Sequence, residues 1–460
     1  MKKNILRYLT YSLVAATALT FGSCSSDDKY DVEGNPDNLI YFKAGEINSN
    51  VFTADVRHTP VGDFSNLTIK IPVFVQHPVS NATRVSVALD NSLVEAYNAK
   101  NGTKYPVLPD AALELQKSSV TLAANEYSST DSIEAQLAEN LLGTLTEPEY
   151  MTAFRIVDVN GNGKASEERG VIYVKVQTGT DYIHVNGNDE IRGSISHTPI
   201  GSMGNVSIDL PAYVNQAAKV GATATISIDN TLVAEYNAEH GTNYPAAPNG
   251  VLNIENGSVT IAQGETTSAT NFKAFIPEDK MTQLTGPQYL IPLRISAKRT
   301  DGTTVDNAGV IYMIFTTAEV YMKEGARSSE MKGTEIQPSE MGDWTCDTEE
   351  ISSIMNSGDW YGWEDGSYVI DMKEVKNVTG LRFYPLYANY SPSVVMSVSL
   401  STDGSNWTEC GTTSSMSRES RWLYYVLYGA IPARYVKVDY TTDIWGYYHF
   451  GIETIRVYAE

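Results

Sequence analysis

The chain has few of the residues that bind transition metals, with 6 histidines and 3 cysteines among its 460 residues. They are scattered singly, and no CxxC, HExxH or His-x-His cluster occurs, which argues against a transition-metal site. A GxGxxG motif after a strand, a GxxxxGK motif and a GxSxG motif are also missing, so the usual signs of nucleotide binding and of a hydrolase elbow are absent. Basic residues are scarce: 33 Lys and Arg face 55 Asp and Glu, and the net charge of −22 argues against nucleic acid as a partner.

Long apolar runs are equally rare. The longest, residues 8–21, has 14 residues and is shorter than the roughly 20 that a transmembrane helix needs. It follows a basic start and ends in Phe21-Gly22-Ser23-Cys24, which resembles the lipobox of bacterial lipoproteins. That resemblance implies cleavage before Cys24 and acylation of this cysteine, whereas an ordinary secretory signal with a chance cysteine is the alternative. The lipid would then be the membrane anchor.

The residues after Cys24 are acidic and polar. Residues 25–31 read Ser-Ser-Asp-Asp-Lys-Tyr-Asp and resemble the surface-export signal of Bacteroidetes-type lipoproteins. A solvated linker would have a similar composition. We therefore expect a signal peptide at 1–24, an acidic tether at 25–38, and a chain anchored in the outer membrane and facing the extracellular side. An inward-facing periplasmic lipoprotein is the alternative.

The remaining chain contains a repeat. Hydrophobic residues make up 42% and charged residues 19%, which is typical of globular domains, and the length suggests about three of them. Residues 90–99, Asp-Asn-Ser-Leu-Val-Glu-Ala-Tyr-Asn-Ala, return 139 residues later as Asp-Asn-Thr-Leu-Val-Ala-Glu-Tyr-Asn-Ala. The same offset relates His58-Thr59-Pro60 to His197-Thr198-Pro199. A period this long indicates two copies of one domain, at 39–180 and 181–318.

Each copy is predicted to be a β-sandwich with one short helix. Residues 67–75, 84–89 and 170–176 alternate between apolar and polar side chains, as half-buried strands do. Ser92 and Glu95 match a capping box at the start of the helix, and Gly102 stands where a left-handed residue would end it. Many short strands around one helix favour a sandwich.

Two features of the repeats resemble binding sites. The repeated His58, Tyr97, Asn98 and Tyr105 could form two copies of a ligand site, but a helix stop, a turn and packed aromatic rings explain them better. Residues 158–163, Asp-Val-Asn-Gly-Asn-Gly, imitate half of a calcium loop, yet position 12 is Arg169 rather than Glu. A hairpin turn explains this stretch without metal.

The last 140 residues differ in composition. They hold all six tryptophans, at 344, 360, 363, 407, 422 and 445. Strand patterns occur at residues 367–372, 380–384, 394–400, 434–440 and 451–458. We predict a third, independent all-β domain at 319–460. Cys346 and Cys410 both belong to it, and they either form a disulfide or remain free thiols.

Four stretches of this domain resemble the discoidin family, also called coagulation factor 5/8 type C, whose bacterial members are often carbohydrate-binding modules. They are residues 367–372, Ser-Tyr-Val-Ile-Asp-Met; 401–407, Ser-Thr-Asp-Gly-Ser-Asn-Trp; 432–438, Pro-Ala-Arg-Tyr-Val-Lys-Val; and the closing strand 451–458. The family's early Asp-Gly segment is matched only loosely by residues 356–363. The resemblance implies a β-sandwich with ligand contacts on loops at one end. Many members also hold a structural calcium ion, for which Glu453 would be a ligand, so no cofactor is required but structural Ca²⁺ is left open.

Sugars are bound by flat aromatic faces under the ring and by polar groups around it. The loops at 359–365, 386–391 and 441–450 are rich in aromatic residues, and an arginine precedes a nearby strand. We expect Trp407 and Tyr368 to be structural. The predicted glycan-binding residues are Trp360, Tyr387, Tyr390, Arg421, Trp445, Tyr447 and Tyr448.

The tandem repeats resemble the immunoglobulin-like domains of unknown function that precede such modules in surface glycan-binding lipoproteins of Bacteroidetes polysaccharide-utilisation systems. The expected fold is therefore all-β, with two tandem immunoglobulin-like sandwiches and a discoidin-like sandwich. The implied function is non-covalent binding of oligo- or polysaccharide, without catalysis, for an outer-membrane importer and surface glycoside hydrolases. An adhesin whose last domain recognises a host or bacterial protein is the alternative. Three small sandwiches leave no room for a catalytic barrel, and scattered carboxylates alone do not indicate an enzyme.

Overall fold

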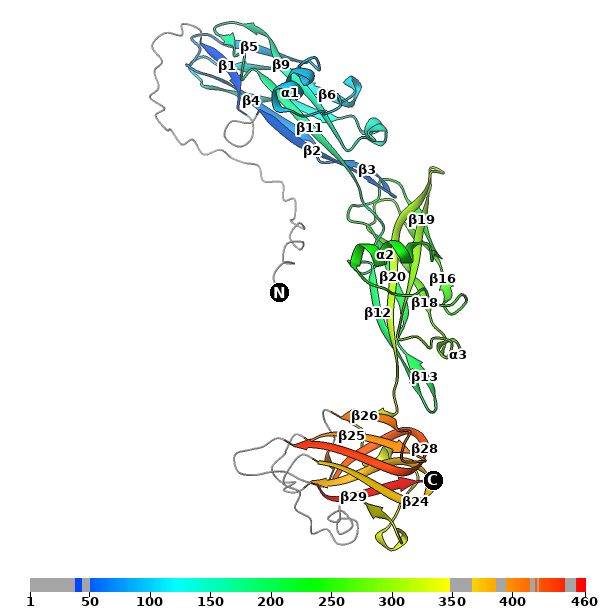
Figure 1. Cartoon of the computed structure of the whole chain (residues 1–460). Helices are drawn as coiled ribbons and strands as arrows, with labels where there is room; N and C mark the ends of the chain where they lie inside the picture. Colours follow the sequence, from blue (N-terminus) through cyan, green and yellow to red (C-terminus); the bar gives the residue numbers. More distant parts are fainter. Residues whose placement is uncertain are drawn as a thin grey trace, which may run out of the picture. The chain divides into compact units, whose positions relative to one another are not determined.

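The computed structural model describes residues 38–43, 50–347, 366–385, 394–413, 418–419, 422–442 and 452–460. It is a mostly β-sheet protein, as the sequence predicts (Figure 1). The described chain forms two compact units. The first comprises the described residues of Met1–Ala54 with Leu67–Ala138 and Glu149–Val176, and the second comprises Asp55–Asn66, Glu139–Pro148 and Gln177–Glu460.

The first repeat is a sandwich of two sheets, with strand orders β10-β1-β4-β8-β6 and β3-β2-β11-β9-β5-β7. Alternating residues of β4, such as Ile69, Ile71 and Val73, are buried between the sheets, which confirms the predicted period. The elements are β1 (Leu39–Phe42), β2 (Val51–Thr59), β3 (Gly62–Ser65), β4 (Thr68–Val75), β5 (Thr83–Leu89), α1 (Leu93–Asn101), β6 (Leu113–Lys117), β7 (Ser119–Leu122), β8 (Ser128–Leu137), β9 (Glu149–Asn160), β10 (Lys164–Ala165) and β11 (Val171–Thr180), with 3₁₀ turns at Asp110–Ala112 and Glu139–Thr144.

The second repeat follows the order of elements of the first without counterparts to β1 and β10, and its layers are β13-β12-β20-β19-β15-β17 and β14-β18-β16, joined where β17 meets β18. Its apolar core includes Phe272, Leu293 and Phe315. The elements are β12 (Glu190–Thr198), β13 (Gly201–Gly204), β14 (Ser207–Tyr213), β15 (Ala222–Ile228), α2 (Leu232–His240), β16 (Asn253–Asn256), β17 (Ser258–Ile261), β18 (Thr267–Phe275), α3 (Glu278–Met281), β19 (Gln288–Arg299) and β20 (Thr304–Glu319). The one-turn helix α3 is additional to the single helix that the sequence predicts.

The start and the end of helix α1 differ in how well the sequence predicts them. Gly102 adopts the left-handed conformation with φ of 67°, and its N–H donates to the Asn98 carbonyl, which confirms the predicted helix end. The predicted capping box is wrong. The Ser92 hydroxyl donates to the Asp90 carboxylate instead of capping the helix, because the preceding turn brings that carboxylate within reach.

The C-terminal domain is a sandwich built around two long strands, β24 (Gly366–Pro385) and β28 (Trp422–Thr442), which pair with each other along most of their length. The predicted strands at 367–372 and 380–384 are thus parts of one strand. The other elements are β21 (Met322–Lys323), β22 (Thr334–Glu335), β23 (Thr345–Cys346), β25 (Val394–Ser401), β26 (Thr408–Thr413), β27 (Arg418–Glu419) and β29 (Ile452–Ala459), with 3₁₀ turns at Ser328–Glu330 and Pro338–Glu340.

The two long strands pass from one layer of this sandwich to the other. The first part of β24 and the last part of β28 pair with β23 and β25, whereas the last part of β24 and the first part of β28 pair with β29 and β21. The crossing lies at a register shift between Asp371 and Lys376, where Lys373 has a φ of 66°. Side chains from both parts of β24, including Ile370 and Phe383, are buried in one core.

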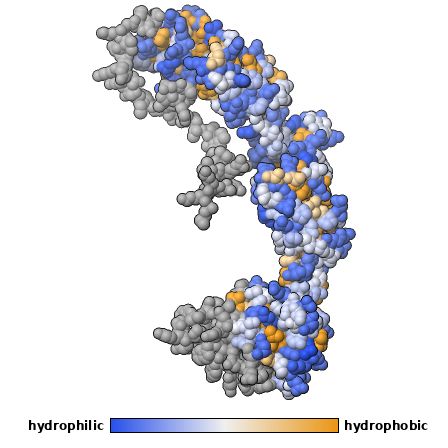
Figure 2. Space-filling view, viewed as in Figure 1, coloured by the Kyte–Doolittle hydropathy of each residue, from blue (hydrophilic) through white to orange (hydrophobic). Residues whose placement is uncertain are grey.

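The surface shown in Figure 2 is largely hydrophilic, with hydrophobic residues in small separate areas. This agrees with the exposed large apolar side chains, which are spread over the sequence from Val107 to Val395. Within the described ranges, no helix is both long and apolar enough to cross a membrane.

Candidate functional site

Strands that flank the predicted binding loops pair with one another at their ends. β24 begins beside the end of β28, with Gly366 opposite Tyr440, and β25 begins beside the same end, with Val394 opposite Thr442. In the other layer β24 ends beside the start of β29, with Pro385 opposite Ile452. β24 and β28 each bend where they pass from one layer to the other.

A bidentate ion pair holds this bend in place. Arg434 on β28 donates from Nε and Nη2 to the two carboxylate oxygens of Asp371, at 2.8 and 3.0 Å. The Arg434 guanidinium, with the Lys373 N–H, holds the pKa of Asp371 well below its usual range. The pair connects the two strands just before β24 passes to the other layer, so it supports the frame from which the loops start.

The predicted binding residues themselves lie outside the described residues. This applies to Trp360, Tyr387, Tyr390, Arg421, Trp445, Tyr447 and Tyr448, and to Cys24. Glu453 lies at the start of β29, but its side chain is outside the described part as well. Among the residues that the structure describes, no group of three or more His, Cys, Asp or Glu is placed to hold a metal ion. The calcium site and the binding residues therefore stay predictions.

The structure reveals an aromatic pair that the sequence analysis missed. Tyr384, near the end of β24, and Trp422, at the start of β28, pack edge to face with ring centroids 5.2 Å apart. The Arg382 guanidinium lies 3.9 Å from the Trp422 ring centroid, in cation–π geometry. These side chains alternate with the buried Leu381, Phe383 and Leu423, so they stand on the outer face of the sheet.

Two arginines meet beside this pair. Arg382 and Arg456 are directly opposite each other on β24 and β29, an arrangement that destabilises a sheet unless the charges are balanced. Glu335 supplies the balance, with contacts of 2.6 Å to Arg382 and 3.8 Å to Arg456. Burial and a hydrogen bond to Glu335 raise the pKa of Tyr458 to about 12, so this phenol stays neutral. The cluster carries one net positive charge beside the Tyr384–Trp422 pair, which suits a ligand with hydroxyl or acidic groups.

A signal for this pair was present but ambiguous. Trp422 begins the continuous apolar run 422–428, Trp-Leu-Tyr-Tyr-Val-Leu-Tyr, which does not show which face of the strand is buried. Trp407, by contrast, follows the predicted turn. Asp403 accepts hydrogen bonds from the N–H groups of Ser405 and Asn406, both at 2.8 Å, and Trp407 packs edge to face on Tyr435. Tyr368 is 7% exposed, in agreement with its predicted structural role.

The repeated residues of the N-terminal domains are structural, as predicted. Asn98 accepts from the Tyr105 N–H at 3.0 Å and donates to the Tyr105 carbonyl at 2.9 Å, and Asn237 makes the same two contacts with Tyr244. The Nε2 of His58 lies 2.9 Å from the carbonyl oxygen of Leu145. The asparagine contacts connect the helix end to the following turn, and the His58 contact connects the β2–β3 hairpin to the segment around Leu145.

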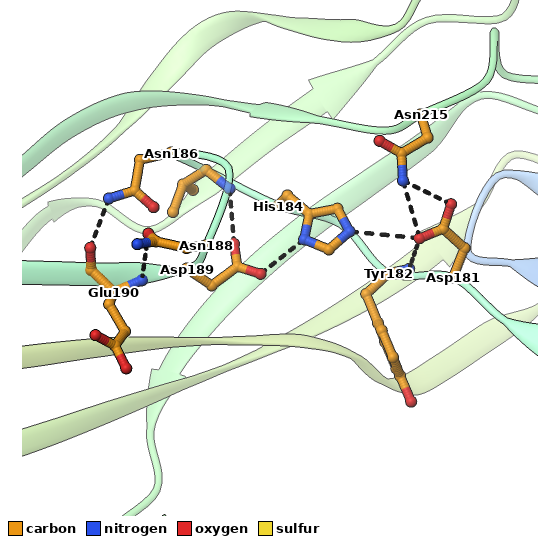
Figure 3. Close-up of polar contacts among 9 residues, drawn as sticks. Asp181, Tyr182, His184, Asn186, Asn188, Asp189, Glu190 and Asn215 are labelled. Carbon is orange, nitrogen blue, oxygen red and sulfur yellow. Dashed lines mark hydrogen bonds and ion pairs between the residues drawn. The ribbon is translucent and has the colours of Figure 1, made fainter. Parts of the chain in front are cut away.

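A polar cluster around His184 is a second feature that the sequence analysis missed (Figure 3). Its Nδ1 lies 2.7 Å from an Asp189 carboxylate oxygen, and its Nε2 lies 3.4 Å from Asp181, which also accepts from the Asn215 amide. Asp181 and Asp189 raise the pKa of His184 to about 9. The imidazole is therefore protonated at neutral pH and is a poor general base, so the cluster fits a structural clamp better than a catalytic site.

The calcium-loop imitation is a glycine-rich turn. β9 ends at Asn160, and Gly161 and Gly163 adopt φ values of 142° and 116°, which other residues rarely reach. The Asn162 N–H donates to the Thr83 hydroxyl at 2.9 Å. This agrees with the prediction of a turn.

Cys346 and Cys410 are both thiols and are not bonded to each other. Cys410 is 1% exposed, and burial raises the pKa of its thiol to about 12. The sequence leaves open either a disulfide or two thiols, and the structure has two thiols.

Comparison with protein families gives two matches. A model described as "-like, N-terminal domain" matches twice, at residues 35–163 and 173–302, which together are more than half of the chain. A model for the F5/8 type C domain matches residues 331–452. A search of curated proteins gave no match.

Similar solved structures share little sequence with this chain. They include a two-domain protein of unknown function from Bacteroides fragilis, with 12% identity, a TM-score of 0.36, and coverage of 60% of this chain and 93% of that chain. A family 32 carbohydrate-binding module from Streptococcus pneumoniae EndoD has 12% identity and a TM-score of 0.23, covering 28% and 100%. A CBM32 module from Clostridium perfringens, in complex with GalNAc-β-1,3-galactose, has 12% identity and a TM-score of 0.22, covering 27% and 100%. Similarities of this size do not determine a ligand.

Proposed function

Because the chain belongs to the family defined by this N-terminal domain, which it carries in two tandem copies ahead of an F5/8 type C domain, we propose that it binds carbohydrate non-covalently and without turnover. The match of residues 331–452 to the F5/8 type C domain carries this proposal. In bacteria, the domains that this sequence resembles are often carbohydrate-binding modules. The aromatic-rich loop sequences supply the flat faces that sugar rings pack on, and the half-buried Tyr384–Trp422 pair adds aromatic rings on the adjoining sheet.

The proposed site combines the loop residues Trp445, Tyr387 and Tyr390 with the sheet residues next to those loops. Tyr384 lies one residue before the end of β24, which precedes the loop of Tyr387 and Tyr390, and Trp422 packs against Tyr384 from the start of β28. Aromatic rings bind the C–H face of a sugar, while an arginine donates hydrogen bonds to hydroxyl or acidic groups at its rim. The ligand would thus be an oligo- or polysaccharide.

Affinity electrophoresis of the full chain against a panel of soluble polysaccharides tests the proposal. Retardation by one glycan supports it. Trp445→Ala should weaken binding of that glycan by roughly 1–3 kcal/mol, the scale of one large apolar side chain, with little loss of thermal stability. Tyr127→Ala is the matched control, since this ring is 61% exposed in the first unit and should leave binding unchanged.

Two results would contradict the proposal. Binding only to protein partners, with no glycan retarded, would favour the adhesin. A lower melting temperature in Trp445→Ala with unchanged glycan affinity would make Trp445 a core residue and would move the site to Tyr387 and Tyr390.

We also propose a cellular location and partners. Acylation at Cys24 would anchor the chain in the outer membrane, and the acidic residues after it would direct it to the extracellular side, where it would hold glycan for surface glycoside hydrolases and an importer. Cys24→Ala should release the chain from membranes, whereas Cys346→Ala, the control, should not. Alanine at Asp27 and Asp28 should keep the anchor but reduce protease accessibility on whole cells. A Cys24→Ala chain that still sediments with membranes would refute the anchor.

A further inference from the structure

In the second unit, the tip of the β2–β3 hairpin packs against the second repeat, at a place that we call the socket. Residues 59–62, between β2 and β3, lie on the second repeat, and Val61 is fully buried in that repeat's core cluster. The Val220 N–H donates to the Val61 carbonyl at 3.0 Å. Arg299 donates from Nε to the Pro60 carbonyl at 3.0 Å and from Nη2 to the Thr59 carbonyl at 2.5 Å. The socket of the second repeat therefore holds the hairpin tip through the buried Val61 side chain and three hydrogen bonds.

The 139-residue offset places the equivalent socket of the first repeat at residues 78–81 and 160–164. One backbone hydrogen bond is shared: the N–H of Asn125 donates to the Val79 carbonyl at 2.8 Å, and the N–H of Gly264 donates to the Ala218 carbonyl at 2.9 Å. The strand register differs by one residue, since Asn160 pairs with Arg84 whereas Arg299 pairs with Ala222. The side chains are different. Asn160 replaces Arg299, Asn81 replaces Val220, and Ser80 replaces Lys219. The first repeat thus lacks the guanidinium and the apolar side chain found at the socket that holds the hairpin tip.

A polar pocket of about 400 Å³ occupies this position in the first unit, within the range of small-molecule sites. Asn38, Ser80, Asn162 and Lys164 line it beside Pro78, and its lining contains no Asp or Glu, although the chain has a net charge of −22. The Ser80 hydroxyl donates to Asn162 Oδ1 at 3.1 Å, which orients the amide. Among the described residues, the Nδ2 of Asn162 has no hydrogen-bond partner, so it can donate to a ligand.

We propose that this pocket is a second carbohydrate-binding site. The Asn162 amide can donate to a ligand rich in hydroxyl groups, the Ser80 hydroxyl can accept from it, and Pro78 offers a small apolar surface to the C–H face of a sugar. A hairpin tip of another copy would meet neither the arginine nor the apolar residue that hold the tip in the second repeat. The proposal shares no residue with the site on the C-terminal domain and stands independently of it.

Hydrogen exchange of the full chain, followed by mass spectrometry, tests this site against galactose, N-acetylgalactosamine, glucose, mannose and glucuronic acid. At least one sugar should slow exchange in peptides that cover residues 78–83 and 160–165. Asn162→Asp keeps the acceptor for Ser80 but removes the donor. This variant and the double variant Ser80→Ala, Asn162→Ala should each raise the sugar concentration needed for half-maximal protection about tenfold. Asp301→Ala, at the corresponding turn of the second repeat, is the matched control and should leave it unchanged.

Three results would overturn the proposal. One is that none of the five sugars protects these peptides, whether or not the C-terminal loops are protected. Another is that protection persists in both variants while their melting temperatures match the parent. The third is protection that depends on the concentration of the chain itself and not on sugar, which would show that a second copy occupies the pocket.

Discussion

Replacing His184 by Gln should destabilise the second repeat in a pH-dependent way. Asp181 and Asp189 raise the pKa of this imidazole from 6.5 to about 9, because their carboxylates contact its two ring nitrogens. A pKa that is higher in the folded state means that protons stabilise the fold. The stabilisation is complete below pH 6.5, where both states bind the proton, and it is lost as the pH rises towards 9.

The difference between the two pKa values sets an upper limit of about 3 kcal/mol, at about 1.4 kcal/mol for each pH unit. The three side chains are 17–26% exposed, so water and salt screen the charges and the expected contribution is about 1–3 kcal/mol. At roughly 4 °C per kcal/mol for a domain of this size, the variant should melt several degrees lower at pH 6.5. At pH 9.5 the parent and the variant should differ by much less.

Calorimetry of the full chain can resolve this transition. All six tryptophans lie in the C-terminal domain, so tryptophan fluorescence identifies the melting of that domain and separates it from the melting of the repeats. His197→Gln is the control, because the ring nitrogens of His197 contact the Ser202 hydroxyl and the Leu284 carbonyl rather than carboxylates. An equal loss of stability in His184→Gln at pH 6.5 and pH 9.5 would refute the reasoning.

Three other changes give further tests. Val61→Ser should lower the unfolding free energy of the second repeat by about 2–4 kcal/mol in denaturant titrations, because a buried methyl surface is lost and a hydroxyl is buried, and an unchanged midpoint would contradict the seating of the tip. Asp371→Asn should lower the melting temperature of the C-terminal domain at neutral pH, and this effect should shrink on acidification, since the Arg434 pair lowers the pKa of Asp371 and its stabilisation fades as the pH falls; a difference that grows in acid would be inconsistent with this. Cys410 should resist alkylation until the domain unfolds, which peptide mapping can follow, and rapid labelling of the native chain would show that the thiol is accessible.

The frame of the candidate site could be predicted, but its full set of residues could not. The order of the strand motifs located the loops, and in the structure the ends of flanking strands pair with one another within each layer. Trp422 was missed because residues 422–428 are a continuous apolar run, which does not show which face of the strand is buried. The contacts of Arg382 with Glu335 and Trp422 join residues 47 and 40 positions apart, and no local pattern predicts which strands become neighbours.

The sequence by itself determined the local and the repeated features of this protein. Alternating burial in β4, the left-handed Gly102 and the two copies of the N-terminal domain all follow from backbone sterics and from the spacing of apolar residues, which act over a few residues. Only the tertiary structure decided how equivalent residues are used. Equivalent positions of the sequence hold a buried hairpin tip in the second repeat and form an open polar pocket in the first, because a side chain's role depends on what the fold brings against it. The pairing of Asp371 with Arg434, 63 residues apart, was decided in the same way, by strand register.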